Sequence, residues 1–215
     1  QEGSLSLQGA LTLNNGSLLD STSGTLTLGG TADNTSRLAL PGTTLALQGD
    51  LAVSGTLATG AGSVLQRNGY ALDLSGGTLE LGGDLDLAGT TTDNATRLLL
   101  LADASLDNSD NTSISTLDLN GFALTISMPR LSVSDPLVLE TSGARLVTGQ
   151  SSFHLNDRLK LDSGELSSTG GTVTLAASAS LGGSGILDIQ GGTLELTESL
   201  NVGDGTLNTS GATVL

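Results

Sequence analysis

The stretch "NGYALDLSGGTLELGGDLDLAG", Asn68–Gly89, contains three leucine-x-leucine pairs spaced about seven residues apart. Gly, Ser and Asp fill the gaps between the pairs, and the interior of a helix tolerates these residues poorly. In an extended chain alternate side chains point the same way, so each pair supplies two inward residues with one outward residue between them. The stretch therefore predicts short strands separated by glycine corners. The predicted inward residues are Leu72, Leu74, Leu79, Leu81, Leu85 and Leu87.

Internal repeats carry the same rhythm along nearly the whole chain. Residues 68–87 align without a gap with residues 120–139, "NGFALTISMPRLSVSDPLVL", at an offset of 52, and every inward position stays apolar. Shorter repeats are "DNTSRLAL" from Asp33 and "DNATRLLL" from Asp93, and "GGTLEL" from Gly76 and again from Gly191. Most steps between apolar positions are six to eight residues long. Three such steps make a coil of roughly 20 residues, which is typical of short strands wound into a parallel solenoid.

We therefore expect an all-β fold, a single-stranded right-handed parallel β-helix (β-solenoid) of about nine or ten coils, as one domain over residues 1–215. A left-handed β-helix and a β-sandwich are the alternatives. The irregular steps and paired leucines disfavour the first, and the close internal copies disfavour the second. The longer steps predict loops at 31–36, 90–96 and 103–111. The number of apolar steps between the "DNT" and "DNA" loops is not a multiple of three. The side of the solenoid on which each strand lies is therefore left open.

The composition limits which residues can fill the core and which molecules the chain can bind. Aromatic residues are 1 % of the chain, so leucine must supply most of the packing. The formal net charge is -15, which repels nucleic acid and anionic lipid, and we expect neither as a partner. No apolar run of about 18 residues is present that would insert into a membrane. The absence of cysteine excludes disulfides and thiolate metal sites.

The coils resemble a known group of surface proteins. "STLDLNGFALTIS" (Ser115–Ser127), "RNGYALDLSGGTLELGG" and "GGTLEL" are similar to the coils of secreted right-handed β-helix proteins, such as autotransporter passengers and filamentous-haemagglutinin-like adhesins. The resemblance implies an extracellular or bacterial cell-surface location and adhesive or structural work. It also implies partners among host or neighbouring-cell surface molecules, and it transfers no catalytic residue.

An enzyme is the alternative function, namely a calcium-assisted polysaccharide lyase or hydrolase on the same scaffold. Pectate-lyase-like enzymes share this architecture and place carboxylates beside an Arg or Lys base. The densest comparable group here comprises His154, Asp157, Arg158, Lys160 and Asp162. Alternation places Lys160 and Asp162 on one outward face and leaves Asp157 and Arg158 at a corner. We therefore expect a solvated coil edge with local ion pairs rather than a catalytic site.

A metal or ice-binding role has weaker support in the sequence. The loop from Asp103 to Ser113 offers Asp103, Asp107 and Asp110 as oxygen ligands for calcium, but it matches no known calcium-loop spacing. A surface turn rich in Asp and Asn explains the composition of this loop. We therefore expect neither a dedicated metal site nor any cofactor. Thr-x-Thr pairs from Thr25 and from Thr172 suggest an ice-binding ladder. Equivalent coils carry Glu80 and Glu195, which would interrupt it.

The apolar rhythm is present near both ends of the sequence, at Leu5 and at Val214. Without a cap, a terminal coil exposes unpaired strand edges and inward leucines. We therefore expect the segment to meet other copies or adjoining coils end to end, as part of a longer solenoid or of a stacking fibre.

Overall fold

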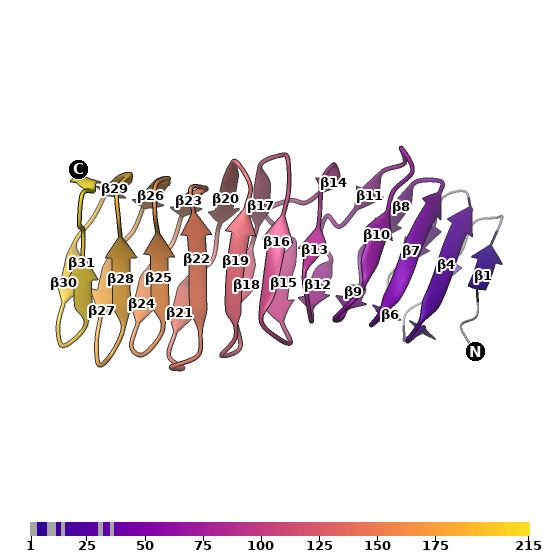
Figure 1. The fold of residues 1–215 in the computed structure, drawn as a ribbon, viewed down its shortest axis with the longest axis horizontal. Helices are drawn as coiled ribbons and strands as arrows, with labels where there is room; N and C mark the ends of the chain where they lie inside the picture. Colours follow the sequence, from indigo (N-terminus) through magenta and orange to yellow (C-terminus); the bar gives the residue numbers. More distant parts are fainter. Residues whose placement is uncertain (1–3, 8–11, 14–15, 30–31, 35–36) are drawn as a thin grey trace.

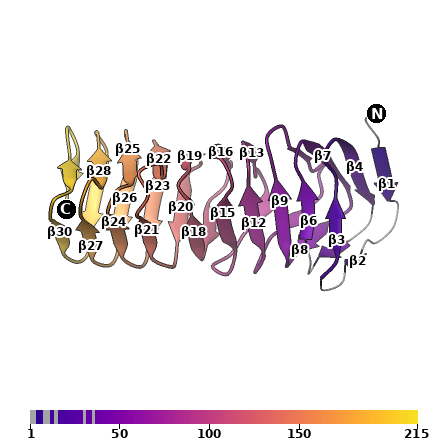
Figure 2. The same ribbon diagram turned by 90° about the horizontal axis from the view of Figure 1, so that it is seen from below.

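The computed structural model describes residues 4–7, 12–13, 16–29, 32–34 and 37–215. All regular elements in this part of the chain are β-strands, and every strand pair is parallel. The strands wind into a β-solenoid of about ten coils, elongated along one axis (Figures 1 and 2). Each coil gives one strand to each of three faces. The described residues include no helix that could cross a membrane.

The first face contains, in order along the axis, β1 (Ser4–Leu7), β4 (Gly24–Gly29), β7 (Thr43–Gln48), β10 (Val64–Gln66), β13 (Leu85–Asp86), β16 (Ala104–Asp107), β19 (Ala123–Ser127), β22 (Arg145–Gly149), β25 (Glu165–Ser168), β28 (Ile186–Ile189) and β31 (Thr206–Asn208).

The second face contains β2 (Thr12–Leu13), β5 (Ala32–Asn34), β8 (Leu51–Val53), β11 (Leu72–Asp73), β14 (Thr90–Thr91), β17 (Thr112–Ile114), β20 (Arg130–Val133), β23 (Ser152–Leu155), β26 (Thr172–Leu175), β29 (Thr193–Leu196) and β32 (Thr213–Val214).

The third face contains β3 (Leu18–Asp20), β6 (Arg37–Leu40), β9 (Thr56–Thr59), β12 (Thr78–Leu81), β15 (Arg97–Leu100), β18 (Thr116–Asp118), β21 (Leu137–Leu139), β24 (Leu159–Leu161), β27 (Ala179–Leu181) and β30 (Leu200–Val202).

The path of the chain is right-handed, as expected. In Figure 1 the strands of the first face run upward at the front, and the chain then passes over the top to the back. Each coil lies farther to the left than the one before it, and Figure 2 shows the first and third faces from below in the same order. Crossover connections between parallel strands favour this hand.

The core is a continuous stack of inward aliphatic side chains. Strands one coil apart keep register, so that Leu26 pairs with Leu45 and Leu79 pairs with Leu98. All six inward leucines predicted from residues 68–89 are at most 6 % exposed, which confirms the alternation. Their counterparts in residues 120–139 are also buried. These are Leu124, Ile126, Leu131, Val133, Leu137 and Leu139.

The 52-residue repeat preserves inward positions but not faces. Leu72 lies on β11 of the second face, whereas Leu124 lies on β19 of the first face. Both copies begin with the same corner, in which Asn68 (φ 54°) and Asn120 (φ 47°) adopt the left-handed conformation before a glycine. Each asparagine amide donates a hydrogen bond to a carbonyl of the preceding coil, that of Leu47 or Leu100. One corner sequence therefore serves two different edges of the solenoid.

The stretches expected to be loops are partly strands. Residues 32–34 form β5, residues 90–91 form β14 and residues 104–107 form β16, because their backbones pair with neighbouring coils. Thr31, Thr35 and Ser36 lie outside the described residues. The strands after the "DNT" and "DNA" loops, β6 and β15, lie on the same face three coils apart. The step count was therefore wrong, because it passed over β10 and β14, two strands that contain no leucine pair.

Candidate functional site

The group from His154 to Asp162 is divided between two faces and a corner. His154 lies on β23 of the second face, whereas Lys160 lies on β24 of the third face. Asp157 and Arg158 are exposed between the two strands, and the Asp157 carboxylate accepts the backbone N–H of Arg158. The structure therefore brings Lys160 and Asp162 together, as alternation predicts, and separates them from His154.

Lys160 is held by two carboxylates. Its Nζ lies 2.8 Å from Asp162 Oδ2 and 2.8 Å from Glu140 Oε1. The hydrogen bonds to Asp162 and then to Glu140 raise the pKa of this amine above its ordinary value. A catalytic base must lose its proton near neutral pH, and this pair of carboxylates opposes that loss. The arrangement is that of an exposed ion-pair cluster.

His154 lies in a shallow groove on the second face. The groove is lined by Arg130, Ser152, Phe153, His154, Thr172, Thr174 and Glu195. His154, Thr174 and Glu195 are register partners on successive strands, which places them in one row along the axis. The Thr174 hydroxyl donates to Glu195 Oε2 at 2.9 Å, and His154 Nε2 lies 2.8 Å from Asn156 Oδ1.

Sequence reasoning missed this row, although a signal was present. Glu195 follows Thr174 by about one coil length, and Thr174 follows His154 by about the same interval. Because no side had been assigned to each strand, that spacing could not be used. The groove offers hydroxyl, imidazole and carboxylate groups for polar contacts. The Thr174 hydroxyl, the Glu195 carboxylate and the His154 imidazole each already have a hydrogen-bond partner within the protein.

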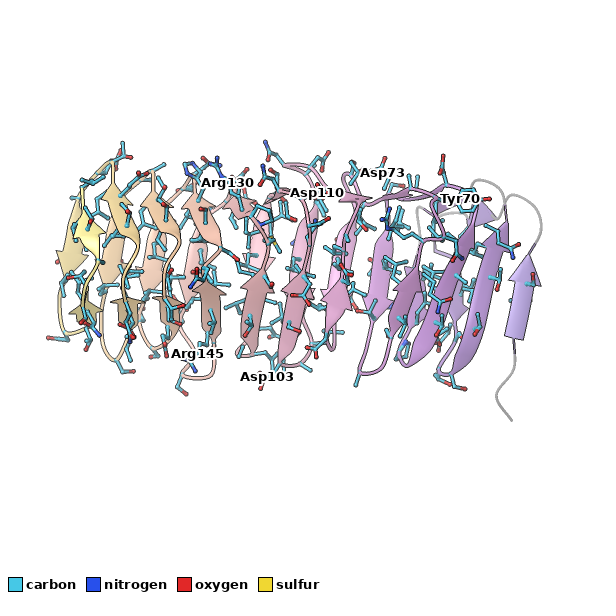
Figure 3. The ribbon with its side chains drawn as sticks, turned by 45° about the horizontal axis from the view of Figure 1, so that its top comes forward. Tyr70, Asp73, Asp103, Asp110, Arg130 and Arg145 are labelled. Carbon is cyan, nitrogen blue, oxygen red and sulfur yellow. The ribbon has the colours of Figure 1, made fainter. Side chains whose placement is uncertain are left out.

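The calcium candidates do not converge. Figure 3 shows Asp103 and Asp110 at opposite edges of the solenoid. Asp103 Oδ1 accepts the N–H of Ala123 in the next coil, and Asp107 is exposed on β16. The described residues contain no group of three or more His, Cys, Asp or Glu side chains that could hold a metal ion.

Corner carboxylates bind backbone groups instead. Asp50, Asp84 and Asp103 each accept an N–H from the following coil. The hydroxyl and N–H of Ser105 lower the pKa of Asp84. The N–H of Gly76 is the first cause of the lowered pKa of Asp93. Such bonds replace ladder hydrogen bonds where the chain turns, so these acids have a structural use.

The Thr-x-Thr pairs are also separated. Thr25 and Thr27 lie on β4 of the first face, whereas Thr172 and Thr174 lie on β26 of the second. A flat ladder requires such pairs on one face, and here they occupy two.

No known protein family, curated protein or solved structure matches this chain. We therefore infer a function from the geometry described above.

Proposed function

We propose that this chain is a rigid, non-catalytic solenoid that works outside the cell, as the stalk of a surface adhesin or as a subunit of an extracellular filament. The observation that carries the proposal is the rod of stacked parallel coils, in which charged side chains such as Arg37 and Lys160 are held in ion pairs between coils. Inward residues in this rod are buried where a further coil follows. Along the sides inward residues are covered, as at Leu181 (2 % exposed) and Leu187 (0 %). Their partners one coil on, Val202 and Leu207, are 42 % and 37 % exposed.

The natural cover for such a coil is another coil. The strand edges of β30, β31 and β32 face along the axis, and each strand pairs only with the coil before it. A further coil, from an adjoining part of a longer chain or from another copy, would continue the ladders and bury the aliphatic residues. The outward residues of these three strands carry no charge, so axial contact meets little repulsion. They are Asn201, Thr206, Asn208 and Thr213.

The polar sides support the same use. Lys160 is bound to a carboxylate of the preceding coil, Arg37 is bound to Glu80 two coils away, and corner aspartates bind backbone N–H groups. These contacts stiffen a rod, and the cluster of Lys160 with Asp162 and Glu140 is occupied by its own ion pairs, which oppose acid–base chemistry there. Export and surface display rest on the resemblance of the coils to secreted β-helix proteins.

Sedimentation velocity and electron microscopy of the purified segment test the proposal. We expect linear assemblies that lengthen with protein concentration, and lateral bundling only when salt screens the acidic sides. Leu207→Asp should shorten the assemblies because it places a charge in the axial contact. Thr206→Asp is the matched control, since it adds the same charge at an outward position of the same strand. A monomer at all concentrations, or equal effects of both variants, would contradict the axial contact.

Adhesion is tested separately. Inert beads coated with the segment should bind cells at their surface, while the segment leaves acidic and neutral polysaccharides uncleaved in the presence of calcium. Cleavage that is lost on Lys160→Met would support the enzyme alternative instead.

A further inference from the structure

Each face of the solenoid consists of two hydrogen-bonded sheets rather than one. On the first face one sheet ends at β10 and the next begins at β13. The second face is divided between β14 and β17, and the third between β18 and β21. No backbone ladder joins these three strand pairs, all of which lie in the continuously described part of the chain. Each break lies one coil farther along than the previous one, so three successive coil–coil contacts each keep two of their three strand ladders. We call these three contacts the seam, and the coils before and after them the two blocks.

Isolated hydrogen bonds cross the seam where the ladder is missing. Beside the break on the third face the backbone N–H of Asp135 donates to Ser115 O (2.9 Å), and one bond that involves a side chain is present on each face. The bonds are Arg67 Nη1 to Gly89 O (2.9 Å), Ser113 N to Thr92 Oγ1 (3.3 Å) and Thr116 Oγ1 to Asp135 Oδ2 (2.7 Å). A strand pair within either block is instead held by several backbone hydrogen bonds. Each contact of the seam therefore has one strand ladder fewer than the contacts within either block.

The core is also less complete beside the seam. A partly open space of about 10 Å³ lies mainly in the coils before the first break and is bounded beyond it by Leu85, and a similar one lies near Leu106 and Ile114 at the second break. Leu65 is only partly buried, although its register partner Leu45 is 3 % exposed. The Thr90 hydroxyl on β14 is buried without a hydrogen-bond partner, but Ser167 Oγ on β25 and Asp188 Oδ1 on β28 are as well, so this feature does not distinguish the seam. The incomplete packing weakens the contact between coils.

The strands change direction across the same boundary. In Figure 1 the strands β4 and β7 lean, whereas β22, β25 and β28 stand upright. Neighbouring coils within each block are nearly parallel. The change in lean and the interrupted ladders have the same location, which is expected if corners of unequal length prevent one continuous register.

We infer that the seam is a built-in yield point, at which the solenoid bends and opens before either block unfolds. The stability of a repeat rod is approximately a sum of coil and coil–coil terms, so the weakest contact between coils opens first. The two blocks would then behave as two cooperative units. This inference goes beyond the proposed function and does not depend on what the surface of the solenoid binds.

Native-state hydrogen exchange on the whole segment tests the inference. We expect amides of β13, β17 and β21 to exchange about tenfold faster than amides of β22 and β25, because opening the seam exposes the first set alone. Arg67→Gln removes the bond to Gly89 and should raise exchange in β10 and β13 by a further factor of about ten. Arg37→Gln is the matched control, since Arg37 also links coils but does so inside the first block, to Glu80.

A second variant keeps the test decisive if Arg67→Gln does not fold. Thr116→Val breaks the bond to Asp135 on the third face, and exposed Thr125→Val serves as its control. Seam-specific acceleration by Arg67→Gln or Thr116→Val supports the yield point. Protection that declines smoothly from the middle to both ends, or equal effects of Arg67→Gln and Arg37→Gln, overturns it.

Discussion

Arg37 and Glu80 form a two-pronged ion pair that spans an entire intervening coil. Arg37 Nη1 and Nη2 lie 2.7 and 2.6 Å from the two carboxylate oxygens, although β9 lies between their strands. Ala58 on β9 faces outward in the same row as Glu80 and is only 4 % exposed. A larger residue there would block the contact, so the small side chain makes the long-range pair possible.

This ion pair should contribute measurably to stability. Glu80→Gln removes a carboxylate whose side chain is 16 % exposed, and we expect a loss of about 1 kcal/mol in the free energy of unfolding. Glu140→Gln is the control, because the Glu140 side chain is 59 % exposed and solvent screens its contact with Lys160. Urea midpoints at low and high salt measure both. Similar losses for the two variants would show that burial of Glu80 is not important.

Substitutions at inward and outward positions of one strand should differ strongly in their effect on the free energy of unfolding. Leu124 is 0 % exposed between Ala104 and Leu146, so Leu124→Asp buries an unpaired carboxylate and should cost about 3–5 kcal/mol. The next residue, Thr125, is exposed, and Thr125→Asp should remain within about 0.5 kcal/mol. The denaturant midpoints of the two variants measure this difference. Equal small shifts would mean that the strand faces the other way.

Acid should weaken the corners at which aspartates bind backbone groups. The lowered pKa values of Asp84 and Asp93 mean that the folded state favours their charged form. Their contribution is complete above the ordinary pKa and is lost as the pH falls below about 4 toward their lowered pKa values. The double variant Asp84→Asn/Asp93→Asn should therefore melt lower at pH 7 and show a smaller drop on acidification.

Asp204→Asn is the control for general charge effects, because it changes the net charge at an exposed corner. Melting temperatures between pH 7 and 2 at constant ionic strength provide the comparison. An acid response of the double variant equal to that of the unmodified chain would argue against these two carboxylates as its source.

Calcium should have no selective effect. Asp103 and Asp110 lie at opposite edges of the solenoid, and Asp103 is already engaged with Ala123, so one ion cannot use both. Melting temperatures in millimolar calcium should match those in millimolar magnesium. A large rise with calcium alone would reveal a site of a different composition and would strengthen the enzyme alternative.

Local pattern was sufficient to predict which residues enter the core. Leu72 and Leu124 are both inward and buried because alternation in a strand depends only on neighbouring residues. The same rule correctly put Lys160 beside Asp162 on an outward face. The composition likewise predicted an aliphatic core, in which Phe153 is the one fully buried aromatic residue among the described side chains.

The face that each strand occupies was decided only by the tertiary structure. Leu72 and Leu124 lie on different faces, because each corner can absorb an extra residue and the differences accumulate along the chain. For the same reason, the sequence alone could not place His154 in a row with Glu195, or show that Arg67 crosses a break in the ladder. Inward and outward positions follow from backbone geometry over two or three residues, whereas lateral neighbours depend on the summed length of every coil between them.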